Sequence, residues 1–229
     1  MSAPTGRALI FTGGRLGDWA LSEIQPGDFL VGADSGAAFL VRHGQKPHLA
    51  VGDFDSVTAE ELEQIRRASD EVLTFDALDK DYTDTELAFD RALALKPREI
   101  LLLGGLGTRF DHSLANVHLL RKALEAGIPG AVIDATNEIR LTDSILRVRG
   151  DRFDYVSLLP LSERVTGITL EGFQYPLHDA TLTIGQSLGI SNRLTAGVGI
   201  IRLASGLLLV IQSKDMPGKD EIGRANRYT

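Results

Sequence analysis

The sequence predicts an α/β protein in which an N-terminal, mostly parallel sheet with flanking helices is followed by a small C-terminal antiparallel β-sandwich domain. Two observations support this fold class. Over roughly the first two-thirds of the chain, short apolar runs alternate with segments of helical apolar spacing. After about Gly150 the strand-like runs are separated by frequent glycines, which is typical of antiparallel β structure.

The N-terminal domain is expected to alternate strands and helices. The expected strands are Ala8–Thr12, Phe29–Ala33, Leu49–Gly52, Glu71–Phe75, Ile100–Leu103 and Ala131–Ile133. The expected helices are Gly36–His43 after a cap at Ser35, one from a cap at Thr58 to about Ala68, one from Thr83 or Asp84 to about Leu95, and one from about His112 to Ala126. Ligands of such sheets bind outside the carboxyl ends of the strands, so the polar residues there should share one edge.

The C-terminal domain is expected to contain short antiparallel strands, namely Tyr155–Leu159, Thr166–Leu170, Ala180–Ile184 and Leu207–Ile211. The segment Ile139–Val148 is expected to begin this sheet-rich part. These patterns predict an α/β domain at residues 1–148, a β domain at 149–215 and a polar tail at 216–229. The tail has no apolar period, so we expect it to be frayed.

The composition is ordinary for a soluble globular protein, and it excludes several classes of function. The 229 residues carry a formal charge of −7, and so acidic a chain lacks the basic face that nucleic-acid binding requires. The absence of cysteine excludes disulfides, thiolate nucleophiles and cysteine-ligated zinc. No apolar stretch approaches the roughly 18 residues of a membrane span, and no signal peptide is evident, so we expect a cytoplasmic protein.

Two acidic segments are candidates for chemistry. Asp53 and Asp55 follow an apolar strand, and strand alternation would point both carboxylates the same way. Such like charges are costly unless a cation or a proton relieves them, although a helix-capping turn also explains an Asp and Ser pattern. The segment from Asp79 to Glu86 reads either as a solvated loop with a capping box at Thr83 and Glu86, or as ligands of a hard cation.

The segment Gly104–His112 lies between a buried strand and a helix. Glycines at this position let backbone N–H groups approach an anion, and the helix N-terminus adds positive potential. Arg109 has the planar fork that grips phosphate, while Asp111 is a candidate for a helix cap, a ligand of a metal-bound water, or both. The segment matches neither a Walker A loop nor the G-x-G-x-x-G dinucleotide fingerprint.

Taken in order, these segments resemble thiamine pyrophosphokinase. The matching pieces are Ala33-Asp34-Ser35-Gly36-Ala37, Gly52-Asp53-Phe54-Asp55-Ser56, Lys80-Asp81-Tyr82-Thr83-Asp84, Gly104–His112, Thr169–Leu177 and Gly189-Ile190-Ser191-Asn192. The resemblance implies an N-terminal domain that binds ATP, a C-terminal β domain, and a homodimer with the thiamine site where the two chains meet. The implied reaction moves the β,γ-pyrophosphoryl group of ATP to the thiamine hydroxyl and releases AMP.

The resemblance also implies roles for individual residues. The expected Mg²⁺ ligands are Asp53, Asp55 and Asp84, and the expected nucleotide contacts are Asp34, Asp81, Thr83, Gly104, Gly105, Arg109 and Asp111. Lys80 and Arg109 are expected to neutralise the charge that develops, so Asp55, Asp84, Lys80 and Arg109 form the expected catalytic set. Ser191 and Asn192 are expected in the thiamine pocket. The chain departs from the family pattern at Thr108, where a glycine is frequent, and at Arg193, where bacterial members often have glutamate.

Three other interpretations remain open at this stage. A phosphatase of the haloacid-dehalogenase type would explain Leu49–Ser56, which resembles its strand followed by Asp-x-Asp, but not the Arg109 segment. A pyrophosphokinase acting on a pterin alcohol would share the aspartates but should lack the segment around Ser191 and Asn192. A non-catalytic nucleotide sensor needs the anion-binding loop but has little use for so many carboxylates.

Overall fold

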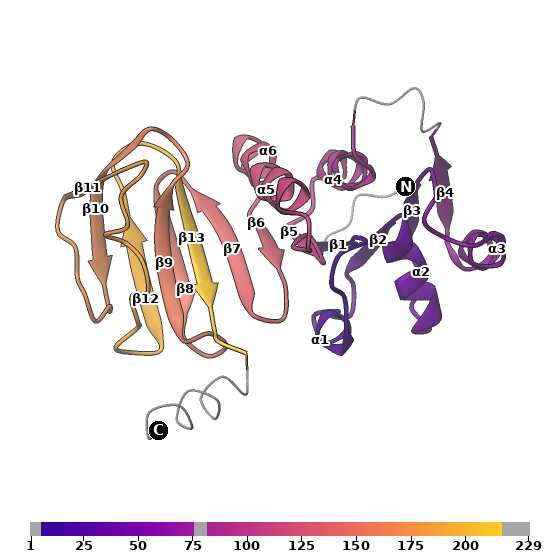
Figure 1. Ribbon diagram of the computed structural model, residues 1–229, viewed down its shortest axis with the longest axis horizontal. Coiled ribbons are helices and arrows are strands. Elements are labelled where there is room, and N and C mark those ends of the chain that lie inside the picture. The colour runs from indigo at the N-terminus through magenta and orange to yellow at the C-terminus, as the bar shows by residue number, and fades with distance from the viewer. Residues whose placement is uncertain (1–5, 76–81, 217–229) are drawn as a thin grey trace, which may run out of the picture. The chain divides into compact units, whose positions relative to one another are not determined.

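The computed structural model describes residues 6–75 and 82–216, and the chain divides into two compact units, Met1–Ala135 and Thr136–Thr229 (Figure 1). We call these unit 1 and unit 2. Lys80 and Asp81, which the sequence assigns to the site, lie outside the described residues, as does residue 79 beside them. No helix within the described ranges has both the length and the apolar character needed to cross a membrane.

Unit 1 contains a sheet of parallel strands, as the sequence predicts. The strands are β1 (Ala8–Phe11), β2 (Phe29–Ala33), β3 (Leu49–Gly52), β4 (Glu71–Thr74), β5 (Ile100–Leu103) and β6 (Gly130–Ile133). They lie in the order β4-β3-β2-β1-β5-β6, and every neighbouring pair is parallel. All residues of β1, β2, β3 and β5 are buried, which explains why these strands read as continuous apolar runs.

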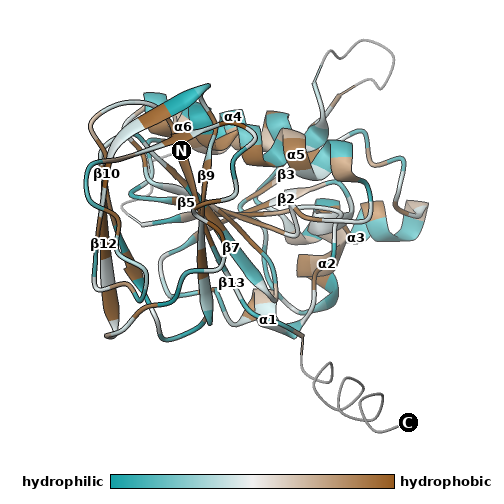
Figure 2. Ribbon diagram, turned by 60° about the vertical axis from the view of Figure 1, so that its left-hand side comes forward, coloured by the Kyte–Doolittle hydropathy of each residue, from teal (hydrophilic) through white to brown (hydrophobic). Residues whose placement is uncertain are grey.

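Helices cover both faces of this sheet. They are α1 (Asp18–Leu21), α2 (Ser35–Arg42), α3 (Ala59–Ala68), α4 (Asp84–Ala94), α5 (Phe110–His118) and α6 (Leu120–Glu125). Figures 1 and 2 show α4, α5 and α6 on one face and α1, α2 and α3 on the other. The core on the α1–α2 side includes Leu9, Phe11 and Phe39, and the single tryptophan, Trp19, is partly buried and packs against it.

Two of the expected helices differ from the sequence prediction, and α1 was not expected. The helix expected from His112 to Ala126 begins at Phe110 and is divided into α5 and α6 at Leu119. The carbonyl of Leu119 accepts from the N–H of Lys122, three residues on, which tightens the turn where the two helices meet. Apolar spacing continues through this point, so the pattern carries no sign of the division. Helix α2 begins at Ser35 rather than after it, with Asp34 in the cap position.

Unit 2 is an antiparallel β-sandwich, as predicted. Its strands are β7 (Asn137–Thr142), β8 (Ile145–Arg149), β9 (Tyr155–Pro160), β10 (Arg164–Glu171), β11 (Ala180–Thr183), β12 (Val198–Arg202) and β13 (Leu208–Ser213). One layer has the order β7-β13-β9 and the other β11-β10-β12-β8. Side chains from both layers, such as Leu158 and Ile168, form one buried core.

The sequence pattern places residues up to 148 in the first domain, whereas the structure places β7 and β8 in unit 2. The reason is strand pairing, because β7 pairs with β13 and β8 pairs with β12, both from the end of the chain. Strand β12 was not expected from the sequence because of its glycine. A Cβ on Gly199 would lie 2.6 Å from the Phe173 ring, so this glycine permits close packing.

Candidate functional site

The loops after β1, β2, β3 and β5 meet at one edge of the unit 1 sheet. Their last residues are in register, with Phe11 beside Leu103 and Ala33 beside Val51. From β1 the chain order runs outward through β2, β3 and β4 on one side and through β5 and β6 on the other. The gap between β1 and β5 is therefore the topological switch point, where open α/β sheets bind ligands.

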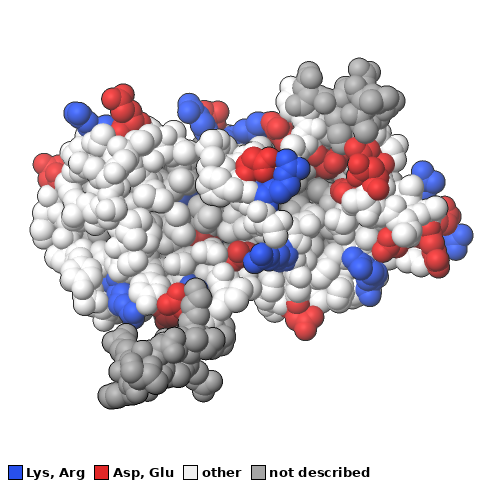
Figure 3. Space-filling model, in the orientation of Figure 1, with Lys and Arg blue, Asp and Glu red and all other residues white. Residues whose placement is uncertain are grey.

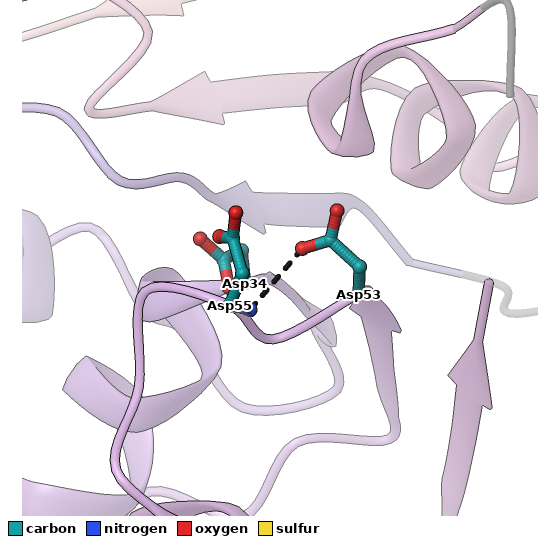
Figure 4. A group of neighbouring side chains, drawn as sticks. All are labelled: Asp34, Asp53 and Asp55. Carbon is teal, nitrogen blue, oxygen red and sulfur yellow. Dashed lines mark hydrogen bonds between the residues drawn. The ribbon is translucent and has the colours of Figure 1, made fainter. Parts of the chain in front are cut away.

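Three carboxylates from the loops after β2 and β3 form what we call the carboxylate cluster, Asp34, Asp53 and Asp55 (Figure 4). One carboxylate oxygen from each lies within 4.8 Å of the others. Oxygen-only donors at this separation suit a hard divalent cation such as Mg²⁺. On the face drawn in Figure 3, acidic side chains gather on one side of unit 1.

The turn after β3 explains how Asp53 and Asp55 come together. Phe54 has a positive φ of 59° and buries its ring in the core with Ile65. The Oδ1 of Asp53 accepts a hydrogen bond of 3.2 Å from the N–H of Asp55. The two carboxylates therefore share a side because the chain turns around a buried phenylalanine, not because an extended strand continues as expected from alternation.

Asp34 joins these two aspartates from a strained position. Its backbone has φ 51° and ψ −121°, a conformation that non-glycine residues rarely adopt. Its Oδ2 accepts a hydrogen bond from the Ser56 hydroxyl, whereas its Oδ1 is buried without a partner among residues 6–75 and 82–216. Burial raises the pKa of the Asp34 carboxyl, and the charges of Asp84 and Asp55 also raise this pKa.

Asp84, the third expected metal ligand, lies in the first turn of α4. Its charge acts on Asp34, but its oxygens are not part of the close group formed by the carboxylate cluster. Thr83 caps α4 by accepting a hydrogen bond of 3.2 Å from the N–H of Glu86. The Glu86 carboxylate accepts from Lys122 at 2.7 Å, so its side chain has a structural partner.

A cleft of about 440 Å³ opens over the switch point, and we call it the glycine cleft. It is lined by Thr12, Gly13, Gly14, Arg15, Thr85, Gly104, Gly105, Gly107, Thr108, Arg109, His112 and Asn116. Among the described residues that line the cleft there is no aspartate or glutamate, although the chain as a whole carries a formal charge of −7. A concave surface of glycine backbone and arginine is suited to a polyanion.

Close packing of two glycine loops forms this cleft. A Cβ on Gly14 would lie 1.9 Å from the carbonyl oxygen of Gly104, so only glycine allows the two loops to touch. The Thr12 hydroxyl donates to the same carbonyl at 2.8 Å, and the Asn116 side chain donates to the Gly105 carbonyl at 2.8 Å. Thr12 and Asn116 were not expected in the site. The one sign available in the sequence was Asn116, a polar residue among the apolar residues of the helix expected from about His112 to Ala126.

Arg109 and Asp111 form an ion pair at the rim of the cleft. The Nη2 of Arg109 lies 2.7 Å from Oδ2 of Asp111, and both side chains are exposed. The hydrogen bond from Arg109 lowers the pKa of Asp111 to about 2. The same bond raises the pKa of Arg109. Asp111 therefore pairs with Arg109 rather than capping α5, where Arg109 itself holds the cap position.

In unit 2, the segments around Tyr175 and Asn192 lie side by side. The Asn192 side chain is buried, its Oδ1 accepts from the N–H of Tyr175 at 3.0 Å, and its Nδ2 donates to the Tyr175 carbonyl at 2.7 Å. The Tyr175 side chain remains 61% exposed. Ser191 is exposed with a positive φ of 58°, and the Arg193 guanidinium lies 4.4 Å from the Tyr155 ring centroid. Asn192 therefore holds the Tyr175 loop, and Ser191 is presented on the surface.

The fold and the site define a class of proteins that have an α/β unit with a carboxylate cluster beside an anion cleft, followed by a β-sandwich. Comparison with known proteins identifies the family. The family model described as "Thiamin pyrophosphokinase, catalytic domain" matches residues 21–130. The model described as "Thiamin pyrophosphokinase, vitamin B1 binding domain" matches residues 143–208.

Individual relatives agree with these matches. A thiamine pyrophosphokinase of Bacillus subtilis (strain 168) is 38% identical over 189 residues, which cover 81% of this chain and 87% of that protein. A crystal structure of thiamine pyrophosphokinase from Bacillus subtilis has a TM-score of 0.85 at 34% identity and covers 92% of this chain and 100% of that chain. One from Geobacillus thermodenitrificans has a TM-score of 0.82 at 35% identity and covers 92% and 99%.

The chain therefore belongs to the thiamin pyrophosphokinase family of enzymes. The catalytic-domain match includes Leu49–Ser56, the segment on which the haloacid-dehalogenase interpretation rested. The vitamin B1-binding match includes Ser191 and Asn192, the segment that a pterin-specific enzyme should lack.

Proposed function

We propose that this protein transfers the pyrophosphoryl group of ATP to the hydroxyl of thiamine, giving thiamine diphosphate and AMP. In this proposal the α/β unit binds ATP and the β-sandwich contributes to thiamine binding. The observation that carries the proposal is that a member of this family has two complementary surfaces at one edge of the unit 1 sheet, the carboxylate cluster and the glycine cleft. Transfer of a phosphate-containing group requires both a cation site and a polyanion site.

The carboxylate cluster fits Mg²⁺ by its chemistry. It offers oxygen donors alone, one of them the buried Oδ1 of Asp34, which has no partner in the described part of the chain, and its like charges repel one another unless a cation is present. We propose that Asp53, Asp55 and Asp84 hold the ion and that Asp34 contributes from the loop after β2. When bound, Mg²⁺ supplies charge neutralisation for phosphate oxygens and polarises the attacked phosphorus.

The chain's own residues position the nucleotide. The backbone of Gly104 and Gly105, with the N-terminal end of α5, faces the glycine cleft and is suited to phosphate oxygens. Arg109 is proposed to leave its ion pair with Asp111 and to bind a phosphate oxygen as negative charge develops in the transition state. The Asp111 carboxylate is then proposed to help order the phosphates and the ion. Thr83 orients the start of α4, whose Thr85 lines the cleft. Lys80 and Asp81 are proposed as further phosphate-ordering residues from the sequence resemblance alone.

The acceptor side of the reaction is assigned to unit 2. The exposed Ser191 and the loop that Asn192 holds around Tyr175 are proposed to form the thiamine pocket. Unit 2 exposes several large apolar side chains, including Ile184, Leu188 and Ile190. Exposed apolar side chains in such numbers suit a partner surface, so we propose a homodimer in which the thiamine site lies at the interface.

An AMP-release assay with ATP, Mg²⁺ and thiamine tests this function, with thiamine monophosphate as the control acceptor. Asp55→Ala and Asp84→Ala should each lower the rate by on the order of 10²-fold or more with the fold intact, because a metal-holding carboxylate is lost. Asp143→Ala, an exposed aspartate of unit 2, is the matched control and should turn over normally. Normal turnover in both site variants would contradict the metal assignment.

The same assay separates the other functions. Release of free phosphate from a phosphomonoester, without AMP from ATP and thiamine, would favour a phosphatase. ATP binding by calorimetry without turnover of any acceptor would favour a nucleotide sensor. AMP release with a pterin alcohol in place of thiamine would redirect the acceptor assignment and leave the nucleotide site unchanged.

A further inference from the structure

Arg15 follows the two glycines that end β1, and neither the sequence motifs nor the family match, which begins at residue 21, assigns it a role. Its side chain lines the glycine cleft on the β1 side, whereas Arg109 lines it on the β5 side. An exposed arginine is ordinarily a solvated surface residue. The placement of Arg15 differs because it lines a cleft whose described lining residues include no aspartate or glutamate.

The two arginines of the cleft differ in their partners. The Arg109 guanidinium is already held by Asp111, with Nη2 2.7 Å and Nε 3.3 Å from its carboxylate oxygens. Arg15 has no hydrogen-bond or ion-pair partner within residues 6–75 and 82–216. Arg15 therefore supplies uncompensated positive charge to the cleft, whereas the charge of Arg109 is largely balanced by the Asp111 carboxylate in the first turn of α5.

The backbone of Arg15 is anchored on both sides. Gly14 touches the β5 loop, where a Cβ would meet the Gly104 carbonyl oxygen at 1.9 Å. Leu16 packs against the core of unit 1, and its N–H donates to the Gly14 carbonyl at 2.9 Å. An arginine on a fixed backbone loses less freedom when it binds, so this position is preorganised for a ligand.

We propose that Arg15 binds the polyphosphate chain of the nucleotide, gripping it from the β1 side of the cleft opposite Arg109. The inference rests on the proposed function, because it takes the anion to be a nucleoside triphosphate. A guanidinium without a carboxylate partner forms charge-assisted, two-pronged hydrogen bonds to phosphate oxygens. Arg15 is thus a substrate-binding residue that acts before and during transfer, and it is distinct from the carboxylate cluster.

Calorimetric titration of the full chain with ATP and Mg²⁺, without thiamine, tests this role. Arg15→Gln should weaken ATP binding by on the order of 10- to 100-fold, the usual effect of losing hydrogen bonds to a charged group. Arg15→Lys, which keeps the charge and loses the fork, should fall between Arg15→Gln and the wild type. Arg91→Gln is the matched control, since Arg91 is an exposed arginine in the last turn of α4, outside the cleft lining.

Adenosine is the second ligand of this test, because it lacks phosphate. A phosphate contact predicts that Arg15→Gln binds adenosine as the wild type does, and that KM for ATP rises while kcat changes less than about threefold. Equal ATP affinity in Arg15→Gln and Arg91→Gln would overturn the proposal, and so would an equal loss for adenosine and ATP. Should Arg15→Gln not fold, Arg15→Lys decides by the same comparison. A wild type that binds ATP but releases no AMP with thiamine would refute the proposed function and leave the Arg15 result standing.

Discussion

At the carboxyl edge of the unit 1 sheet, the loops after β2 and β3 hold carboxylates, whereas the loops after β1 and β5 hold glycines and arginines. The carboxylate cluster brings like charges within 4.8 Å of one another, at the cost of a strained Asp34 and a buried oxygen that has no partner among the residues the structure describes. The glycine cleft has no acid among its described lining residues and is held together by backbone contacts and neutral hydrogen bonds.

The difference shows how one sheet edge serves two ligands of opposite charge. Strand order alone decides the division, because β2 and β3 lie on one side of β1 and β5 lies on the other. In the first region, a bound cation relieves the repulsion between the carboxylates. In the second region, a bound polyanion accepts hydrogen bonds from the exposed backbone N–H groups and pairs with the arginines. The two regions should therefore respond independently to substitution.

A large effect is expected from closing the cleft while leaving the carboxylates unchanged. Gly14→Ala places a Cβ 1.9 Å from the Gly104 carbonyl oxygen, so the two loops must separate. We expect ATP affinity to fall at least about 10-fold and stability to fall by roughly 1–3 kcal/mol, as overpacking does elsewhere. Titration calorimetry and thermal unfolding measure these effects, and Mn²⁺ binding, reporting on the carboxylate cluster, should persist.

Gly107→Ala is the matched control for this substitution. Gly107 also lines the cleft, but the nearest atom to its added Cβ would be the Gly14 Cα at 4.0 Å, so there is room. Its stability should stay close to that of the wild type. ATP affinity in Gly14→Ala within twofold of Gly107→Ala would show that the contact between the loops does not shape the anion site.

Sequence reasoning placed Asp34, Asp53 and Asp55 at one sheet edge, but it assigned Asp84, and not Asp34, to the metal with Asp53 and Asp55. Asp34, Asp53 and Asp55 follow apolar strands, and the rule for parallel sheets places such residues at one edge. The positive φ of Phe54 has no counterpart in periodicity, because it depends on a ring buried in a tertiary core. Strand alternation therefore predicted correctly that the Asp53 and Asp55 carboxylates lie on one side. The assumed extended backbone was wrong, because the chain turns between them.

The cleft was harder to predict because its parts are distant in sequence. Gly104 and Gly105 stood out within one loop, but the contact between Gly14 and Gly104 joins segments from two strands. Thr12 and Asn116 both donate to backbone carbonyls of the loop after β5, so their roles exist only after folding. The boundary between unit 1 and unit 2 was hard to predict for the same reason, because β7 and β8 pair with strands from the end of the chain.

A smaller and opposite effect is expected from the carboxylate cluster. Asp34→Asn removes a charge that is partly buried and repelled, so in the presence of a chelator the variant should be more stable by about 1 kcal/mol. Asparagine also tolerates the positive φ at this position. Thermal unfolding with EDTA measures the gain, and Asp143→Asn is the control. Added Mg²⁺ should stabilise the wild type more than the variant, whereas activity of the variant should fall.

The pH dependence of this gain has a defined sign. The folded-state pKa of Asp34 is raised above the ordinary value of 3.8, so the folded protein holds this proton more tightly than the unfolded chain. The wild type therefore loses stability as pH rises from 3.8 through the raised pKa, while Asp34→Asn does not. The gap between them should widen over that window and stay constant above it. A gap that does not change with pH would contradict the assigned desolvation of Asp34.

The smallest effect concerns Thr108, which lines the cleft between Gly107 and Arg109. Its side chain is exposed, and we expect it to limit how closely the backbone between Gly107 and Arg109 approaches a phosphate oxygen. Thr108→Gly should tighten ATP binding by about two- to threefold, since a closer N–H contact is offset by the greater freedom of glycine. Calorimetry with ATP measures the change, and Mn²⁺ affinity should be unaltered because no carboxylate is touched. Weaker ATP binding in Thr108→Gly would show that the threonine side chain itself contributes to the anion site, so that the cleft depends on a hydroxyl as well as on backbone and arginine.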